Sequence, residues 1–195
     1  MFREFRTNLL LFALLMLLTG FGYPMLTLGL SQNLFPSEAN GSLIKDQDRI
    51  IGSHLIGQDF THAAYFHGRP SAAGTGYDAT QSGGSNLSPT DPKLLEIVSQ
   101  RVSEFKTANS PLLVPVDLIT SSASGLDPHI SPASARFQAA RVASERHMPI
   151  TQVEKLIASH IEGPSVGFIG EKRVNVLELN LALDQLPLAP ASSNE

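Results

Sequence analysis

The chain has 195 residues, a net charge of −4 and no cysteine. The lack of cysteine excludes disulfides and thiolate metal sites, and the net negative charge disfavours a nucleic-acid partner. Beyond an apolar N-terminal segment, the remaining length suits one globular domain.

The N-terminal segment from Thr7 to Ser37 contains no Asp, Glu, Lys, Arg or His. Its centre, Leu9–Leu30, spans about 33 Å as a helix, enough to cross the ~30 Å hydrocarbon core of a bilayer. A cleaved signal peptide is the alternative, but this run exceeds the usual apolar core and no Ala-x-Ala site precedes a plausible cut. The segment therefore predicts a single uncleaved transmembrane helix.

Charge predicts the orientation of this helix. Arg3 and Arg6 precede the apolar run, and the first basic residue after it is Lys45. The positive-inside rule then places the N-terminus in the cytoplasm and the domain outside it. Pro24 and the glycines around it favour contact with a protein neighbour, since small residues let another helix approach. The alternative is that Pro and Gly are simply common in transmembrane helices.

These arguments divide the chain into five parts. We expect a cytoplasmic N-terminus (1–8), a transmembrane helix (9–30), a linker (31–40), an extracytoplasmic domain (41–186) and a tail (187–195).

The first half of the domain is expected to hold a hairpin, a long loop and a helix. Two apolar runs flank the polar stretch Lys45–Arg49, which indicates a β-hairpin. The stretch Tyr65–Asp91 is rich in Gly, Ser, Pro and Asn but contains aromatic residues, which is typical of an ordered functional loop. Asp91 and Pro92 then open a helix as N-cap and first residue. Its predicted apolar face is Leu94, Leu95, Val98, Val102 and Phe105.

The second half is expected to alternate helices and strands. The predicted elements are a strand at 112–119, a helix from Pro132 to about His147 capped by Ser131, a helix opened by a Thr151–Glu154 capping box, a strand at 174–177 and a terminal helix at 179–186. This order predicts an α/β or α+β domain.

Two loops, 65–91 and 120–132, concentrate polar side chains and could form one site if they meet. Their candidates for partner contact, together with Pro24, are Tyr65, His67, Arg69, Asp117, Asp127 and His129. A hydrolase could use Ser124, His67 and Asp127, but no Gly-x-Ser-x-Gly elbow is present. A zinc site lacks paired-ligand spacing. The Ser82–Ser85 segment suits either an anion-binding nest or a tight turn.

Several long motifs occur in a fixed order along the chain. They are Leu55–Phe60, Tyr65–Ser71, Ser82–Leu87, Val114–Thr120, Ser124–Ser131, Arg173–Leu177 and Leu179–Asp184. Together they closely resemble the C subunit of the bacterial Kdp potassium-transporting P-type ATPase, over nearly the whole chain.

The resemblance implies a role in the bacterial inner membrane. The family's complex imports potassium using ATP, with a channel-like A subunit, a hydrolysing B subunit and a small F subunit as partners. The C subunit is implied to be a catalytic chaperone that stabilises the complex and raises the B subunit's affinity for ATP. ATP contact is implied for Gln81, Ser82, Gly83, Gly84, Ser85 and Asn86.

The predicted orientation conflicts with a direct contact to ATP, because it places Gln81–Asn86 outside while ATP is inside. We therefore expect the coupling to be indirect. A membrane-anchored extracytoplasmic adaptor, or the hydrolase above, remains the alternative function.

Overall fold

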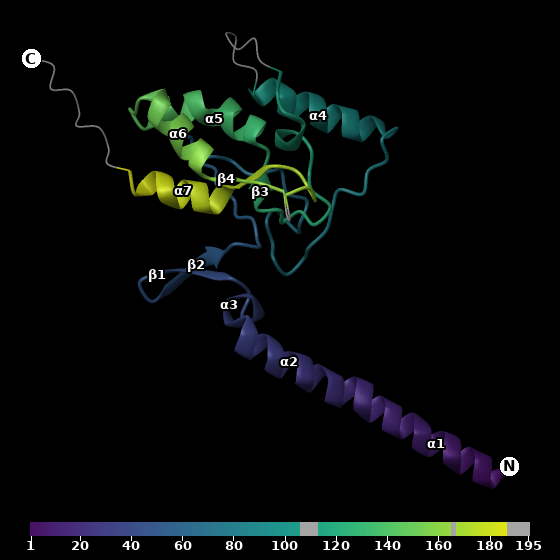
Figure 1. Cartoon of the computed structure of the whole chain (residues 1–195). Helices are drawn as coiled ribbons and strands as arrows, with labels where there is room; N and C mark the ends of the chain where they lie inside the picture. Colours follow the sequence, from purple (N-terminus) through teal and green to yellow (C-terminus); the bar gives the residue numbers. More distant parts are fainter. Residues whose placement is uncertain (106–112, 165–166, 187–195) are drawn as a thin grey trace, which may run out of the picture. The chain divides into compact units, whose positions relative to one another are not determined.

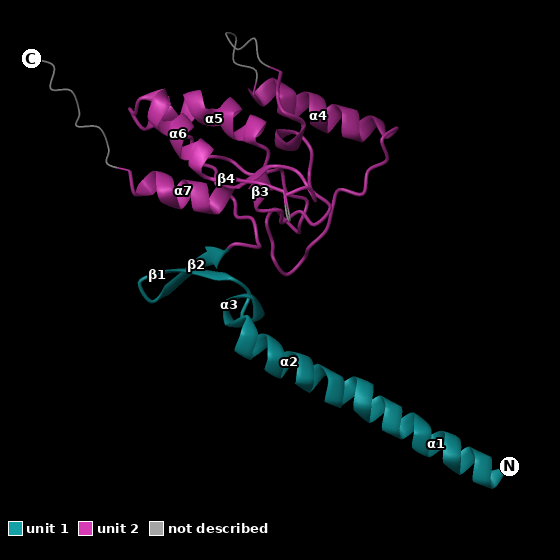
Figure 2. Ribbon diagram, viewed as in Figure 1, with its two compact units in different colours: residues 1–53 teal, residues 54–195 magenta. Residues whose placement is uncertain are grey.

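The computed structural model describes residues 1–105, 113–164 and 167–186 (Figure 1). The chain forms two compact units, residues 1–53 and residues 54–195 (Figure 2). The first unit holds the apolar helix and the hairpin, and the second holds the remaining elements.

One long helix forms most of the first unit. It comprises α1 (Phe2–Leu17), a π-helical turn η1 (Leu18–Gly22) and α2 (Tyr23–Leu34). With a mean hydropathy of 2.1 in its most apolar window, Phe2–Leu34 is long and apolar enough to cross a membrane, as predicted.

The π-helical turn ends two residues before Pro24. Proline lacks an N–H, and its ring clashes with the carbonyl four residues earlier in a regular α-helix. The wider turn at Leu18–Gly22 therefore accommodates Pro24 without ending the helix. Nearby hydroxyls bond to the helix backbone, with Thr19 donating to the Leu15 carbonyl and Thr27 to that of Pro24.

A short helix and the predicted hairpin follow. Helix α3 (Pro36–Ala39) precedes β1 (Leu43–Asp46), which pairs with β2 (Arg49–Ser53) in antiparallel register. Gln47, in the turn between the strands, has a positive φ of 53°.

The second unit is a mixed α and β domain. Its elements are α4 (Pro92–Phe105), the 3-10 turn η2 (Val116–Leu118), β3 (His129–Ile130), α5 (Pro132–Glu145), α6 (Ile150–Ser159), β4 (Ile161–Glu162), β5 (Arg173–Asn175) and α7 (Val176–Asp184). The three short strands pair antiparallel in the order β3-β5-β4. Small antiparallel sheets with separate helices make the domain α+β, within the predicted class.

Helices α5, α6 and α7 bury the core against this sheet (Figure 1). Small residues on α5, such as Ala135 and Ala139, let α6 and the sheet approach closely. Helix α4 contains no fully buried residue and meets α5 through Phe105, whose ring centroid lies 6.0 Å from that of Phe137. Leu95, predicted on the apolar face of α4, is 63% exposed, so that assignment was wrong.

Two helix caps follow the sequence prediction. The Asp91 carboxylate accepts the Lys93 N–H at 2.9 Å, and the Ser131 hydroxyl accepts the Ser134 N–H at 3.1 Å. The end predicted for α4 at 109–111 lies outside the described residues.

The predicted strand at 112–119 is wrong over its described part. Residues 113–115 are irregular and Val116–Leu118 forms a 3-10 turn, in which the Leu118 N–H bonds to the Pro115 carbonyl at 3.1 Å. Pro115 cannot donate to a strand ladder, and Asp117 is used instead at the start of α5.

The two later helices begin earlier than predicted. Helix α6 starts at Ile150 after Pro149, so Thr151 lies inside the helix and makes no capping bond. Helix α6 ends at Ser159, and Ile161 lies in β4. The predicted strand at 174–177 ends at Asn175, whose side chain caps α7 by accepting the N–H groups of Leu177 and Glu178 at 3.1 and 3.2 Å. The terminal helix therefore spans 176–184 rather than 179–186.

Candidate functional site

The polar loops of the second unit are held by buried side chains of the helices. We call residues 63–67 the strap. Asn180 of α7 accepts the Phe66 N–H and donates to the Phe66 carbonyl, both at 2.9 Å. Gln138 of α5 does the same for His67, at 2.8 and 3.0 Å. These two amides replace the neighbouring strand that the strap lacks.

Two arginines complete the hydrogen bonding of the strap. Arg141 donates to the carbonyls of Ala63 and Tyr65, the latter at 3.0 Å. Arg146 donates to the Ala64 carbonyl at 2.8 Å and pairs with Asp184 at 2.6 Å. Because these anchors bond to backbone, they hold the chain path whatever the strap side chains are.

Tyr65, a predicted partner contact, is engaged within the domain. Its hydroxyl donates to Asp184 at 3.0 Å, and the Arg146 guanidinium lies 4.7 Å above its ring. This is the geometry of a cation–π contact. Tyr65 therefore has a structural role here.

The two polar loops meet in the structure. Arg69 pairs with Asp127 at 3.2 Å, and the Ser71 hydroxyl donates to the Gly125 carbonyl at 2.6 Å. The Gly83 N–H donates to the Ser124 carbonyl at 2.9 Å. These contacts join segments about 40 to 60 residues apart into one body, which we call the loop junction.

Gly125 makes this close approach possible. Its φ is +66°, and a Cβ atom there would lie 2.6 Å from the Gly83 carbonyl oxygen and 2.7 Å from the Ala73 nitrogen. Both neighbours are backbone atoms, so a side chain would push the loops apart.

Asp127 is the charged centre of the loop junction. Burial opposes its ionisation, but hydrogen bonds from His129 and the nearby charge of Arg69 together hold the pKa of its carboxyl below the usual value. The His129 N–H donates to this carboxylate at 3.0 Å. Asp127 is therefore an anion at neutral pH.

Tyr77 closes the junction from the other side. Its hydroxyl donates to the Arg69 carbonyl at 2.5 Å, and Cβ atoms at Gly57 or Gly68 would collide with its ring or hydroxyl. Burial, followed by the charges of Asp59 and Asp127, raises the pKa of Tyr77 to about 12. Its phenol stays protonated and donates under all ordinary conditions.

Asp117 stabilises the start of α5. Its carboxylate accepts the Ser131 N–H at 2.7 Å and the hydroxyls of Ser131 and Ser134. A carboxylate at a helix N-terminus is favoured by the helix dipole. This explains why Asp117 leaves the predicted strand.

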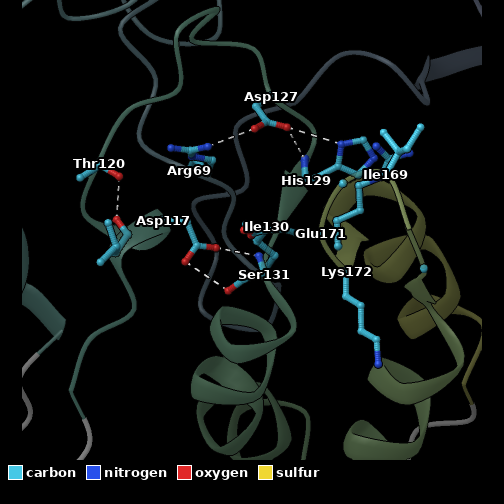
Figure 3. Close-up of a pocket in the computed structure, with 14 residues that line it drawn as sticks. Arg69, Asp117, Thr120, Asp127, His129, Ile130, Ser131, Ile169, Glu171 and Lys172 are labelled. Atoms are coloured by element: carbon cyan, nitrogen blue, oxygen red, sulfur yellow. Dashed lines mark hydrogen bonds and ion pairs between the residues drawn. The ribbon is translucent and has the colours of Figure 1, made fainter. Parts of the chain in front are cut away.

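An open pocket of about 490 Å³ lies beside these residues (Figure 3). Arg69, Asp117, Asp127 and His129 line it, together with Lys172 and neighbouring residues of the β4–β5 connection. Four of the predicted partner contacts thus share one concave surface. His67 lies instead in a separate pocket of about 450 Å³, which Arg69 also lines.

The segment Gln81–Asn86 is partly committed to contacts inside the protein. Gln81 donates to Asp78 at 2.7 Å, and the Ser82 hydroxyl donates to the Ser124 carbonyl at 3.0 Å. A Cβ atom at Gly84 would lie 3.1 Å from the Ala123 carbonyl oxygen. Ser85 and Asn86 are exposed, and their side chains make no hydrogen bond within the described part of the chain.

The three residues of the hydrolase alternative have different partners. The His67 Nε2 atom lies 3.3 Å from the His62 carbonyl oxygen. The Ser124 hydroxyl accepts the Leu126 N–H at 3.1 Å, and the Asp127 carboxylate pairs with Arg69. Burial, with a smaller contribution from Arg141, lowers the pKa of His67. Among residues 1–105, 113–164 and 167–186, no group of three or more His, Asp or Glu side chains is placed to hold a metal ion.

A small α+β domain in the same chain as one apolar helix of membrane-spanning length fits the class of membrane-associated proteins. A family model described as "KdpC: K+-transporting ATPase, c chain" matches residues 5–185. A potassium-transporting ATPase KdpC subunit of Koribacter versatilis is 55% identical over 91% of this chain and 92% of its own. Those of Rhodospirillum rubrum and Photorhabdus laumondii are 53% and 51% identical, over 97% and 93% of this chain and 100% and 96% of their own.

The chain therefore belongs to the KdpC family of potassium-transporting ATPase subunits. It has a role in a potassium-import complex that uses ATP, and the resemblance deduced from the sequence motifs is confirmed.

Proposed function

We propose that this chain is the accessory subunit that stabilises the potassium-import complex and raises the B subunit's affinity for ATP without holding ATP itself. The observation that supports this proposal is that the Ser82 hydroxyl and the Gly83 N–H both donate to the Ser124 carbonyl. A phosphate-binding loop needs such donors aimed at the anion. Turning these two donors toward a phosphate would break their hydrogen bonds to Ser124 and open the loop junction.

The apolar helix supplies the docking surface in this proposal. Gly22 and Gly29 lie seven residues apart and so share one helix face at about 100° per residue. A Cβ atom at Gly29 would meet nothing within 4 Å, and one at Gly22 would meet only ordinary contacts. This face supports close approach of a membrane helix from the channel-like A subunit.

The proposal includes an orientation in the bacterial inner membrane. Residues 1–8 lie in the cytoplasm, 9–30 cross the membrane, 31–40 link, 41–186 form the extracytoplasmic domain and 187–195 form a tail. The basic residues Arg3 and Arg6 before the span support this direction. The B and F subunits then meet this chain through the membrane or the A subunit, and ATP stays on the opposite side from the domain.

Co-purification tests the docking surface. A tag on this chain should recover potassium-stimulated ATPase from membranes, and Gly22→Leu with Gly29→Leu should reduce the recovered activity. Thr27→Leu, on the opposite face, is the matched control and should recover the wild-type amount. Equal recovery with the double glycine variant would contradict docking through this face.

Labelling tests the orientation, because the natural chain has no cysteine. A single Ser99→Cys variant should react with a membrane-impermeant maleimide in intact spheroplasts. Reaction of this exposed residue only after permeabilisation would reverse the proposed topology.

A further inference from the structure

The connection between β4 and β5 presents two large apolar side chains to solvent. Phe168 is 78% exposed and Ile169 is 58% exposed. Gly167 and Gly170 flank them with φ values of +84° and +98°. Both values lie in the left-handed region, where glycine costs least, so the backbone is shaped to project these two side chains. We call residues 167–170 the apolar tip.

Three charged residues, Glu171, Lys172 and Arg173, follow the apolar tip. Arg173 pairs with Glu162 at 2.8 Å, which neutralises it. Lys172 makes no ion pair with any residue that the structure describes, and it is exposed. Figure 3 shows its side chain extended away from the Arg69–Asp127 pair. Glu171, the remaining charge, is also exposed.

We infer that the apolar tip is a lipid-contacting element: Phe168 and Ile169 insert into the interfacial layer of the bilayer, and Lys172 binds an anionic headgroup. Aromatic and aliphatic side chains beside a lysine are the usual composition of such an element. The contact needs the apolar helix to cross the bilayer, but neither its direction nor the coupling to ATP.

The small size of the apolar tip favours lipid over a protein partner. A specific protein interface buries roughly 800 Å² per partner and uses about 20–30 residues. Two neighbouring side chains fall far below this, whereas a membrane contact can use a few side chains when a second anchor is present. Here the apolar helix in the same chain keeps lipid at a high effective concentration around the domain.

The apolar tip is continuous with the pocket at the loop junction. Residues 169–173 also line the pocket beside Asp127, so a lipid contact at the apolar tip would lie next to that pocket.

A fluorescent label tests the inference on the full chain in vesicles. A single Glu171→Cys variant, labelled with an environment-sensitive dye, leaves Phe168 and Ile169 intact. In phosphatidylcholine–phosphatidylglycerol vesicles, quencher-bearing lipids should reduce its emission roughly two-fold. A label at Ser99→Cys, on the exposed polar face of α4, should keep its emission.

Two matched variants and one lipid change complete the test. Phe168→Ser with Ile169→Ser should abolish the quenching, while Leu95→Ser, which removes another exposed apolar side chain, should not. Phosphatidylcholine alone, or Lys172→Gln, should reduce the quenching. Equal emission with and without quencher lipids would overturn the inference. So would shielding that appears only when the pump subunits are added and that quencher lipids do not affect, because the tip would then be a protein interface.

Discussion

The side chain of Asn180 bonds to both backbone groups of Phe66 at 2.9 Å, and Phe66 is completely buried. The Asn180 amide thus makes the two hydrogen bonds that a neighbouring strand would otherwise make to a residue 114 positions earlier in the chain. Gln138 repeats this arrangement at His67, so the strap is held at two consecutive residues.

The first prediction concerns this amide. Asn180→Leu keeps the volume but leaves the Phe66 N–H and carbonyl buried without partners, so it should lower the free energy of unfolding by about 2–4 kcal/mol. Denaturant unfolding of the full chain measures this change. Gln100→Leu, on the exposed face of α4, is the control and should cost less than about 0.5 kcal/mol. A similar effect of both variants would show that the strap does not depend on Asn180.

The second prediction concerns the closest backbone contact of the loop junction. Gly125→Ala places a methyl group 2.6 Å from the Gly83 carbonyl oxygen at a φ of +66°, so it should destabilise the domain by at least about 2 kcal/mol. Gly163→Ala, where a Cβ atom meets nothing within 4 Å, should be nearly neutral. The melting temperatures of both variants test this prediction, and equal values would contradict the close approach of Gly125 to the Gly83 carbonyl.

The third prediction concerns the ion pair. Arg69 and Asp127 are 26% and 29% exposed, so solvent screens their attraction and the pair itself contributes only about 1 kcal/mol. Asp127→Asn should therefore have a modest effect on stability but should speed proteolysis within 69–86, because that segment loses its charged anchor. Asp48→Asn, in the exposed hairpin turn, is the matched control. An unchanged cleavage rate in Asp127→Asn would show that the Arg69–Asp127 pair does not hold the segment 69–86 in place.

The fourth prediction follows from the lowered pKa of His67. Its ordinary value is 6.5, and the folded protein favours the neutral ring because burial and Arg141 disfavour the cation. The unfolded chain binds a proton first on acidification, so this contribution is complete above pH 6.5 and is lost as the pH falls below it. The melting temperature should therefore fall between pH 7.5 and 5.5, and His67→Gln should flatten that slope. Gly163→Ala, which changes no ionisable group, should keep the wild-type slope.

Local signals were sufficient for the apolar helix, the hairpin and the caps at Asp91 and Ser131. Each depends on residues within a few positions, so periodicity and side-chain chemistry find it. The meeting of the two polar loops could be suggested only as a condition, because Arg69 and Asp127 are distant in sequence. Asn180, Gln138, Arg141 and Arg146 were missed altogether. Their only local signal is a polar side chain on an otherwise buried helix face, as for Gln138 between Ala135 and Ala139.

The errors have physical causes at particular residues. Val116 and Leu118 have strand-like composition, but Pro115 removes a donor and the Asp117 carboxylate is drawn to the start of α5. The strand predicted at 174–177 ends at Asn175 instead of Leu177, because the Asn175 side chain is the N-cap of α7. In both cases a side-chain bond to a distant or following N–H overrode the propensity of the neighbours.

The ATP dependence of the purified complex tests whether this chain raises the affinity for ATP without contacting ATP. Potassium-stimulated ATPase activity should be measured against ATP concentration for the complex with this chain, without it, and with Ser85→Ala and Asn86→Ala together. These two side chains are the exposed members of Gln81–Asn86 that make no hydrogen bond within the described part of the chain, so replacing them leaves the loop junction intact. We expect loss of the chain to raise the ATP concentration needed for half-maximal activity, whereas the double variant should leave it unchanged. An equal rise in the double variant would show that this segment contacts ATP and would contradict indirect coupling.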